Sequence, residues 1–180
     1  MNLNNYRKIF PQNQEVRVGV LSDTHGYFPN SLENFFKNCH IVFHAGDVGN
    51  LSVVEKLNNI CSLVAVFGNI DGPDIRSRFP EIQRIHIAGL NIFMMHICGY
   101  PGKYKPFARK LLEEERPDVV ITGHSHILKI IYDKTLMHWH INPGACGQAG
   151  WHHCFTAVRF EIRNKKIENL ELWEMERKII

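Results

Sequence analysis

The sequence lacks the patterns that mark several common classes of protein. Its five cysteines are odd in number, and no two of them form a CxxC pair. We therefore predict neither a disulfide framework nor a structural zinc site built on paired cysteines. No stretch approaches the roughly 18 consecutive apolar residues of a membrane span. Basic runs are absent too, and a formal net charge of +3 is too small to indicate a nucleic-acid surface.

Residues 1–15 lack the apolar segment of a secretory signal peptide. Together with the scattered cysteines, this predicts a cytoplasmic protein with reduced thiols and no membrane partner. Residues 1–15 are polar, so we expect them to form either a disordered N-terminal extension or a short additional packed segment. After it we find no repeat, low-complexity tract or linker, and the length suits one domain over residues 1–180.

Residues 16–26, VRVGVLSDTHG, predict a buried strand that ends at a carboxylate and an imidazole. Apolar residues occupy both alternating sets of positions 16–21, as in the parallel strands of α/β proteins. Ligands of such sheets bind beyond the carboxyl ends of the strands, where Asp23 and His25 would lie. A lone D-x-H pair is weak evidence, because an exposed turn looks the same. The other strands must therefore supply partners.

Later segments of the chain end in similar residues. Strands expected at 40–44 and 63–67, with helices after Asn30 and over 51–58, complete a β-α-β-α-β pattern typical of a parallel sheet. Asn30 and Glu33 resemble a capping box. Further along we expect a hairpin (82–87, 90–95), a helix that ends before Pro117, a strand (118–122) and two more hairpins (127–132 with 136–141, and 155–162 with 167–173). The candidate ligands at these ends are Asp23, His25, Asp47, Asn69, His96, His124 and His126.

Two carboxylates, four imidazoles and one amide are too many ligands for one tetrahedral ion. They suit two divalent ions, with Mn²⁺ preferred and Fe²⁺, Zn²⁺, Ni²⁺ or Co²⁺ as alternatives. Two such ions at ~3.5–4 Å repel each other and need a bridging anion. Asp47 lies at the centre of the ligand order and could supply it. No Ser/His/Asp triad or cysteine nucleophile is evident.

The blocks SDTHG, HAGD, GNID, the His of MMHICG, and GHSH followed by INPGA resemble the calcineurin-like metallophosphoesterases. They are most similar to the small single-domain phosphodiesterase branch, and the resemblance runs from Val16 to about Trp173. It implies an α/β fold, a four-layer α/β/β/α sandwich of two mixed sheets flanked by helices.

The resemblance also implies roles for the candidate ligands. Asp23, His25 and His126 would hold one metal, while Asn69, His96 and His124 would hold the other. Asp47 would bridge the two, and His25, Asn69, His96 and Asp47 would form the catalytic set. A hydroxide shared by the ions would attack the phosphorus of a small or nucleotide-like phosphate ester. The alternative is a non-catalytic, protein-binding scaffold such as the retromer scaffold subunit. Assembly into a homo-oligomer stays open.

The remaining histidines are expected to lie outside the site. His138 and His140 alternate with apolar residues, which predicts an exposed face. His44 either supports a ligand or is a satisfied buried histidine. His152 and His153 are expected on the surface.

Several other positions bear on the chemistry. Asn142 is expected to brace the metal loops, and Cys98 to be a small loop residue near the site. Larger phosphatases of the superfamily carry a proton-donating His directly after the metal-binding Asn, where this chain has Ile70. Asp71, His44 or His152 could replace it. The nearest candidates for a phosphate clamp are Arg76, Arg78, Lys103 and Lys105.

Overall fold

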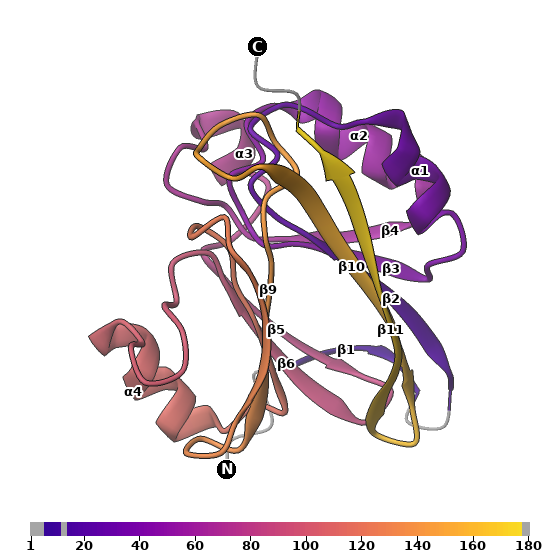
Figure 1. The fold of residues 1–180 in the computed structure, drawn as a ribbon. Coiled ribbons are helices and arrows are strands. Elements are labelled where there is room, and N and C mark those ends of the chain that lie inside the picture. Colours follow the sequence, from indigo (N-terminus) through magenta and orange to yellow (C-terminus); the bar gives the residue numbers. More distant parts are fainter. Residues whose placement is uncertain (1–5, 12–13, 178–180) are drawn as a thin grey trace.

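The computed structural model describes residues 6–11 and 14–177 and shows two β-sheets packed face to face, with helices outside them (Figure 1). Helices α1 (Asn30–Phe36) and α2 (Leu51–Ile60) pack on the outer face of one sheet, and α4 (Pro106–Glu115) packs on the outer face of the other. This arrangement confirms the four-layer α/β/β/α sandwich. The polar N-terminal segment contributes a short edge strand, because β1 (Arg7–Phe10) pairs in parallel with β5 (Ile82–Ile87).

The five-stranded sheet has the order β11-β10-β2-β3-β4. Its parallel part, β2-β3-β4, is the β-α-β-α-β unit predicted from the sequence. The capping box is not formed: Asn30 is the first residue of α1, and Pro29 precedes it without a side-chain cap. The bounds are β2 (Val16–Leu21), α1 (Asn30–Phe36), β3 (Ile41–His44), α2 (Leu51–Ile60), β4 (Ser62–Ala65), β10 (Cys154–Arg163) and β11 (Lys166–Glu176).

The six-stranded sheet has the order β1-β5-β6-β7-β9-β8. Strands β6, β7 and β9 run parallel, so their carboxyl ends lie at the same edge. The bounds of the remaining elements are α3 (Pro73–Arg76), β6 (Leu90–Met95), α4 (Pro106–Glu115), β7 (Val119–Ile121), β8 (Leu128–Asp133) and β9 (His138–Pro143).

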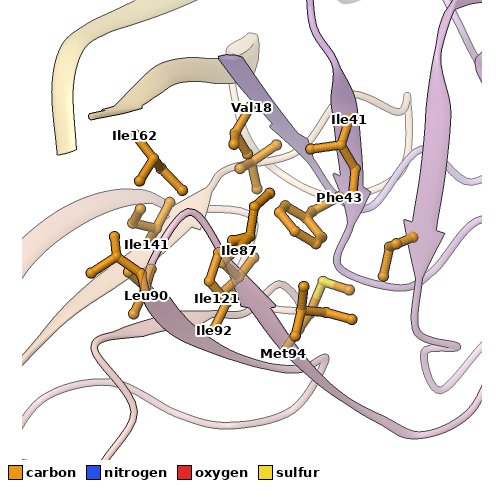
Figure 2. Close-up of a cluster of buried hydrophobic side chains, with 14 of the residues drawn as sticks. Val18, Ile41, Phe43, Ile87, Leu90, Ile92, Met94, Ile121, Ile141 and Ile162 are labelled. Atoms are coloured by element: carbon orange, nitrogen blue, oxygen red, sulfur yellow. The ribbon is translucent and has the colours of Figure 1, made fainter. Parts of the chain in front are cut away.

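The main core fills the space between the two sheets (Figure 2). Val18, Ile41 and Phe43 from one sheet meet Ile92 and Ile121 from the other, and all five are fully buried. Burying such side chains contributes about 1.5–3 kcal/mol each. The core therefore fixes the strands whose carboxyl ends carry the candidate ligands.

The prediction that His138 and His140 are exposed is wrong, since both are buried. Strand β9 lies inside its sheet, between β7 and β8, and its outer face is covered by Tyr104. The Tyr104 hydroxyl is 2.8 Å from His138 Nε2. The two histidines do face away from the core between the sheets, in which Ile141 lies, but their face is covered rather than exposed. Near the hairpin the exposed residues are instead Met137 and Trp139.

This burial predicts a pH dependence of stability. Burial lowers the pKa of His140 to about 4, with His138 and Lys129 adding to the effect and Asp133 opposing it. An unfolded His titrates near 6.5. The folded state, which holds His140 neutral, is therefore fully stable with respect to this group above pH 6.5, and it loses stability as the pH falls toward 4. We expect His140 alone to lower the free energy of unfolding by about 2 kcal/mol between pH 7 and pH 5. His140→Leu should reduce this dependence by that amount in urea unfolding, whereas replacing the exposed His153 should leave it unchanged. An equal slope in both variants would contradict the prediction.

Candidate metal centre

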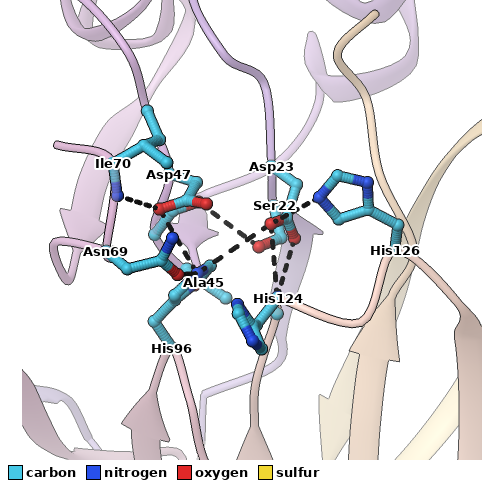
Figure 3. A network of polar contacts seen from close by, with 12 residues as sticks. Ser22, Asp23, Ala45, Asp47, Asn69, Ile70, His96, His124 and His126 are labelled. Atoms are coloured by element: carbon cyan, nitrogen blue, oxygen red, sulfur yellow. Dashed lines mark hydrogen bonds and ion pairs between the residues drawn. The ribbon is translucent and has the colours of Figure 1, made fainter. Parts of the chain in front are cut away.

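The seven candidate ligands follow five different strands, and the fold brings them to one place; Figure 3 labels all of them except His25, whose ring is close to Asp47 and His126. Asp23 and His25 follow β2, Asp47 follows β3, and Asn69 follows β4 in the same sheet. From the facing sheet come His96 after β6, and His124 and His126 after β7. The site thus lies where the carboxyl ends of parallel strands from both sheets meet.

Two groups of side chains present their ligand atoms within 4.8 Å of one another. The first group is Asp23, His25 and His126, in which Asp23 Oδ1 is 3.2 Å from His126 Nε2. The second is Asp23, Asp47 and His96, in which Asp47 Oδ1 is 3.3 Å from His96 Nε2. Two ligands that each lie about 2.1 Å from one ion are roughly 3–4 Å apart. The donor set and its spacing therefore fit divalent ions.

Asp47 approaches both groups. Its second oxygen, Oδ2, is 3.9 Å from His25 Nε2. Asn69 joins the second group, with its Oδ1 3.1 Å from His96 Nε2. His124 belongs to neither group, and its ring lies edge-on to His96 with centroids 5.4 Å apart. Its backbone amide instead donates to Asp23 Oδ2 at 3.0 Å.

Burial alone would raise the pKa of the Asp47 carboxyl. The hydrogen bond and charge of His96, the Ile70 amide and the charge of His25 outweigh this effect, so the pKa lies below its usual value. The hydrogen bond to Asp23 raises the pKa of His126 despite partial burial. The Asp47 carboxylate is thus ionised at neutral pH and contributes negative charge that favours cations.

Five of the seven candidate residues have a left-handed backbone conformation. Their φ angles are 55° for Asp23, 47° for His25, 55° for Asp47, 68° for His124 and 58° for His126. Such conformations cost about 1–3 kcal/mol each and persist where the surrounding structure imposes them. Their concentration in one place indicates that the loops are shaped to aim these side chains.

Two glycines permit the close packing of the loops. A Cβ atom on Gly68 would overlap the carboxylate of Asp47, and one on Gly46 would lie 2.6 Å from His96 Nδ1. Gly46 also has a φ of +95°, which glycine adopts without strain. The ligands therefore approach the backbone more closely than any larger residue would allow.

Asp71 braces the site in a way that the sequence did not reveal. Its Oδ2 accepts hydrogen bonds from the amides of Gly68 (2.8 Å) and Val48 (3.2 Å), and its Oδ1 accepts one from Gly49 (2.8 Å). The carboxylate thus ties the Asp47 loop to the Asn69 loop. An acid two residues after Asn69 carries no recognisable signal in a single sequence.

Arg76 continues this brace. Its Nε donates to the Asp71 carbonyl (2.6 Å), and its Nη2 donates to the carbonyls of Gly68 (2.9 Å) and Asn69 (3.3 Å). Its guanidinium also lies 4.3 Å from the centre of the Phe67 ring. Arg76, one of the four candidates for a phosphate clamp, therefore has most of its donors bound to the main chain. The other candidates, Arg78, Lys103 and Lys105, have exposed side chains.

His44 is both a buried, satisfied histidine and a support for the metal loops. Its Nδ1 accepts from the Gly46 amide at 3.2 Å, so its Nε2 carries the proton and donates to Thr24 Oγ1 at 2.9 Å. The Thr24 hydroxyl in turn donates to the Val48 carbonyl at 2.9 Å. Burial lowers the pKa of His44 to about 4. The ring is thus neutral and links the loops that follow β2 and β3.

Two more expectations concern the loops near His126. Asn142 braces them as predicted: its Nδ2 donates to the Gly123 carbonyl (2.8 Å) and to Ser125 Oγ (3.0 Å).

His152, expected as a surface residue, instead lies against His126 with ring centroids 5.3 Å apart. The return of the chain before β10 brings it there, and its Nε2 donates to the Gly147 carbonyl at 2.9 Å.

Loss of the Asp71 brace should weaken both the fold and the centre. We expect Asp71→Ala to lower the free energy of unfolding by about 2–4 kcal/mol, because the amides of Val48, Gly49 and Gly68 lose their acceptor. Metal affinity should fall with it. Urea unfolding and metal titration would measure both, with Asp74→Ala, an exposed position in α3, as the control. Equal stability of the two variants would contradict the bracing role.

Comparison with known proteins agrees with this geometry. Residues 16–165 match the model of the Calcineurin-like phosphoesterase superfamily domain. The chain is 31% identical over 115 residues to a probable metallophosphoesterase of Methanocaldococcus jannaschii, covering 61% of this chain and 58% of that protein, less than two thirds of its length. It is 29% identical over 139 residues to a probable metallophosphoesterase of Methanothermobacter thermautotrophicus, covering 71% and 76%.

Solved structures show the same fold at low sequence identity. The crystal structure of Vps29 from Entamoeba histolytica in complex with Zn²⁺ superposes with a TM-score of 0.69 at 16% identity, covering 89% of this chain and 98% of that one. A structure described as a novel archaeal phosphodiesterase gives a TM-score of 0.65 at 24% identity, covering 89% and 99%.

Proposed function

Because the chain belongs to the calcineurin-like phosphoesterase superfamily, we propose that it is a phosphodiesterase that uses two divalent ions to hydrolyse small or nucleotide-like phosphate esters. The observation that carries this proposal is the pair of donor groups that share Asp23 and are both approached by Asp47. The group of Asp23, His25 and His126 would serve one ion, and His96 and Asp47 of the other group would contribute to the second.

We assign the ligands to the ions as follows. Asp23, His25 and His126 would hold one ion, whereas Asn69, His96 and His124 would hold the other. Asp47 would contact both, because its Oδ1 faces His96 and its Oδ2 faces His25. Oxygen and nitrogen donors in this mixture suit Mn²⁺ first, with Fe²⁺, Zn²⁺, Ni²⁺ and Co²⁺ as alternatives.

The bound ions would supply a nucleophilic water at neutral pH and would neutralise the charge on the phosphate oxygens. The chain's own residues do the positioning. Asp23 and Asp47 supply the carboxyl ligands, and Asp71, Arg76 and His44 fix the loops that present them. This division of roles requires no nucleophilic side chain from the protein.

The first test is metal content. Seven donors exceed the needs of one ion, so we expect about two divalent ions per chain after reconstitution with Mn²⁺ at neutral pH. Elemental analysis of the dialysed protein gives the number, and a panel of phosphate mono- and diesters gives the activity. One ion or fewer at saturating metal would exclude the dinuclear proposal.

A second candidate function is a protein-binding scaffold of the same fold. The observation that favours it is an exposed apolar cluster on the β8–β9 hairpin, formed by Tyr132, Met137 and Trp139. A scaffold would not need all seven ligand positions filled with good donors, and here they are. Retention of two metal ions without hydrolysis of any ester in the panel would favour the scaffold.

No helix in the described part of the chain combines the length and apolarity needed to cross a membrane. We propose in addition that residues 1–180 form a single metallophosphoesterase domain that acts in the cytoplasm.

A further inference from the structure

A cavity of about 200 Å³ opens beside the metal centre. Asn69 and His96 form the side that faces the centre, and Phe67, Met95 and Ile97 supply apolar walls. Phe67 and Ile97 are half-buried and Met95 is buried, and most of the surface that lines the cavity is apolar. A group attached to a phosphate held at Asn69 and His96 would enter this cavity.

The rim of the cavity carries one fixed cation and one carboxylate, Arg76 and Glu81. Arg76 is held by its hydrogen bonds to main-chain carbonyls and by its contact with the Phe67 ring. Those bonds use Nε and Nη2, so Nη1 donates to none of the described residues. Glu81 is exposed and adds an acceptor. The rim thus offers a fixed donor and an acceptor above an apolar interior.

We propose that this cavity binds a single ring system, a nucleobase or aryl group, on the ester group that remains attached to phosphorus. The inference rests on the proposed phosphodiesterase function and names its substrate class. The volume is below the roughly 300–1,000 Å³ of pockets for drug-sized ligands, which suits one ring system. A departing oxygen needs water or a cation to stabilise its charge, and the apolar walls of the interior offer neither, since the cation Arg76 lies at the rim. The cavity therefore suits the group that stays.

Binding can be tested without turnover. In the full chain with Zn²⁺ added and its methionine methyl groups labelled with ¹³C, adenosine should shift the Met95 signal in a saturable way. Met94, on the opposite face of β6 in the main core, and the exposed Met137 are internal controls that should not move. Ile97→Trp fills the cavity and should abolish the shift.

Kinetics test the same cavity with two diesters that share one leaving group, thymidine 5′-(4-nitrophenyl) phosphate and methyl 4-nitrophenyl phosphate. We expect kcat/KM to favour the thymidine ester by about tenfold or more, as the burial of a ring predicts. Ile97→Trp should bring this ratio close to one. The same substitution at Ile131, an exposed isoleucine on β8, should leave the ratio as it is in the natural chain.

The two experiments separate the inference from the function on which it rests. Hydrolysis of both esters with a ratio near one, and no shift at Met95, would overturn the cavity assignment and leave the phosphodiesterase proposal standing. A saturable shift at Met95 that Ile97→Trp removes, without hydrolysis of either ester, would support the cavity and overturn the enzymatic function.

Discussion

Replacing Asp47 with Asn is expected to release at least one of the two metal ions and to lower diester hydrolysis by several orders of magnitude, with the fold retained. The change removes one negative charge and alters the volume little. Both oxygens of Asp47 face imidazoles, His96 at 3.3 Å and His25 at 3.9 Å, so one side chain serves both donor groups. Loss of a single charge-stabilising contact in an active site typically costs ~10²–10³-fold, and here an ion is lost as well.

A matched control is available for this variant. Asp133→Asn makes the same substitution at another buried carboxylate, which accepts from the amides of Thr135 and Leu136 at the β8–β9 turn. It should keep both the metal content and the rate. Elemental analysis, kcat/KM for a nitrophenyl diester and circular dichroism would be measured on both variants. Hydrolysis by Asp47→Asn near the rate of the natural chain would show that Asp47 does not hold the ions together.

The candidate site was predictable from the sequence because its residues follow directly after buried strands. A strand end is a local feature: apolar residues 16–21 are followed at once by Asp23 and His25. Parallel strands then bring such ends together, whatever the details of the loops. To predict that the seven residues converge, it was therefore enough to identify the strands and the parallel arrangement of their ends.

The supporting contacts were not predictable, because they depend on tertiary packing. Asp71 binds main-chain amides of the Asp47 loop, and Arg76 binds main-chain carbonyls of the segment before α3; main-chain groups carry no sequence signature. His138 and His140 sit on a strand whose outer face is covered by Tyr104, more than 30 residues earlier in the chain. Alternation along one strand shows which residues share a face but not what covers that face.

The sequence did not identify a residue that protonates the leaving group. The geometry argues against each of the three candidates for this role, Asp71, His44 and His152. Asp71 accepts three backbone hydrogen bonds through its carboxylate oxygens. His44 is enclosed between Thr24 and Gly46, and burial lowers its pKa to about 4. His152 gives its Nε2 proton to the Gly147 carbonyl.

Cleavage is therefore expected to depend steeply on the pKa of the leaving group. The position after Asn69 is Ile70, an exposed side chain with no proton to give. A placed acid typically contributes ~10²–10⁴-fold, and its benefit grows as the leaving group becomes more basic. Without one, methyl aryl phosphates should react far faster than dialkyl phosphates. The measurement is log kcat/KM against leaving-group pKa at fixed metal and pH, with chemistry shown to be rate-limiting.

The same position allows the missing acid to be supplied. Ile70→His places an imidazole directly after Asn69, where larger phosphatases of the superfamily carry their proton donor. We expect it to flatten the dependence on leaving-group pKa and to raise rates most for the most basic leaving groups, by about tenfold or more. Ile70→Ala controls for loss of the side chain and should keep the steep dependence. A shallow dependence in the natural chain would show that it already has an acid, and single replacements of Asp71, His44 and His152 would then identify it. A steep dependence that becomes shallow only in Ile70→His would show that this chain hydrolyses esters without proton donation to the leaving group.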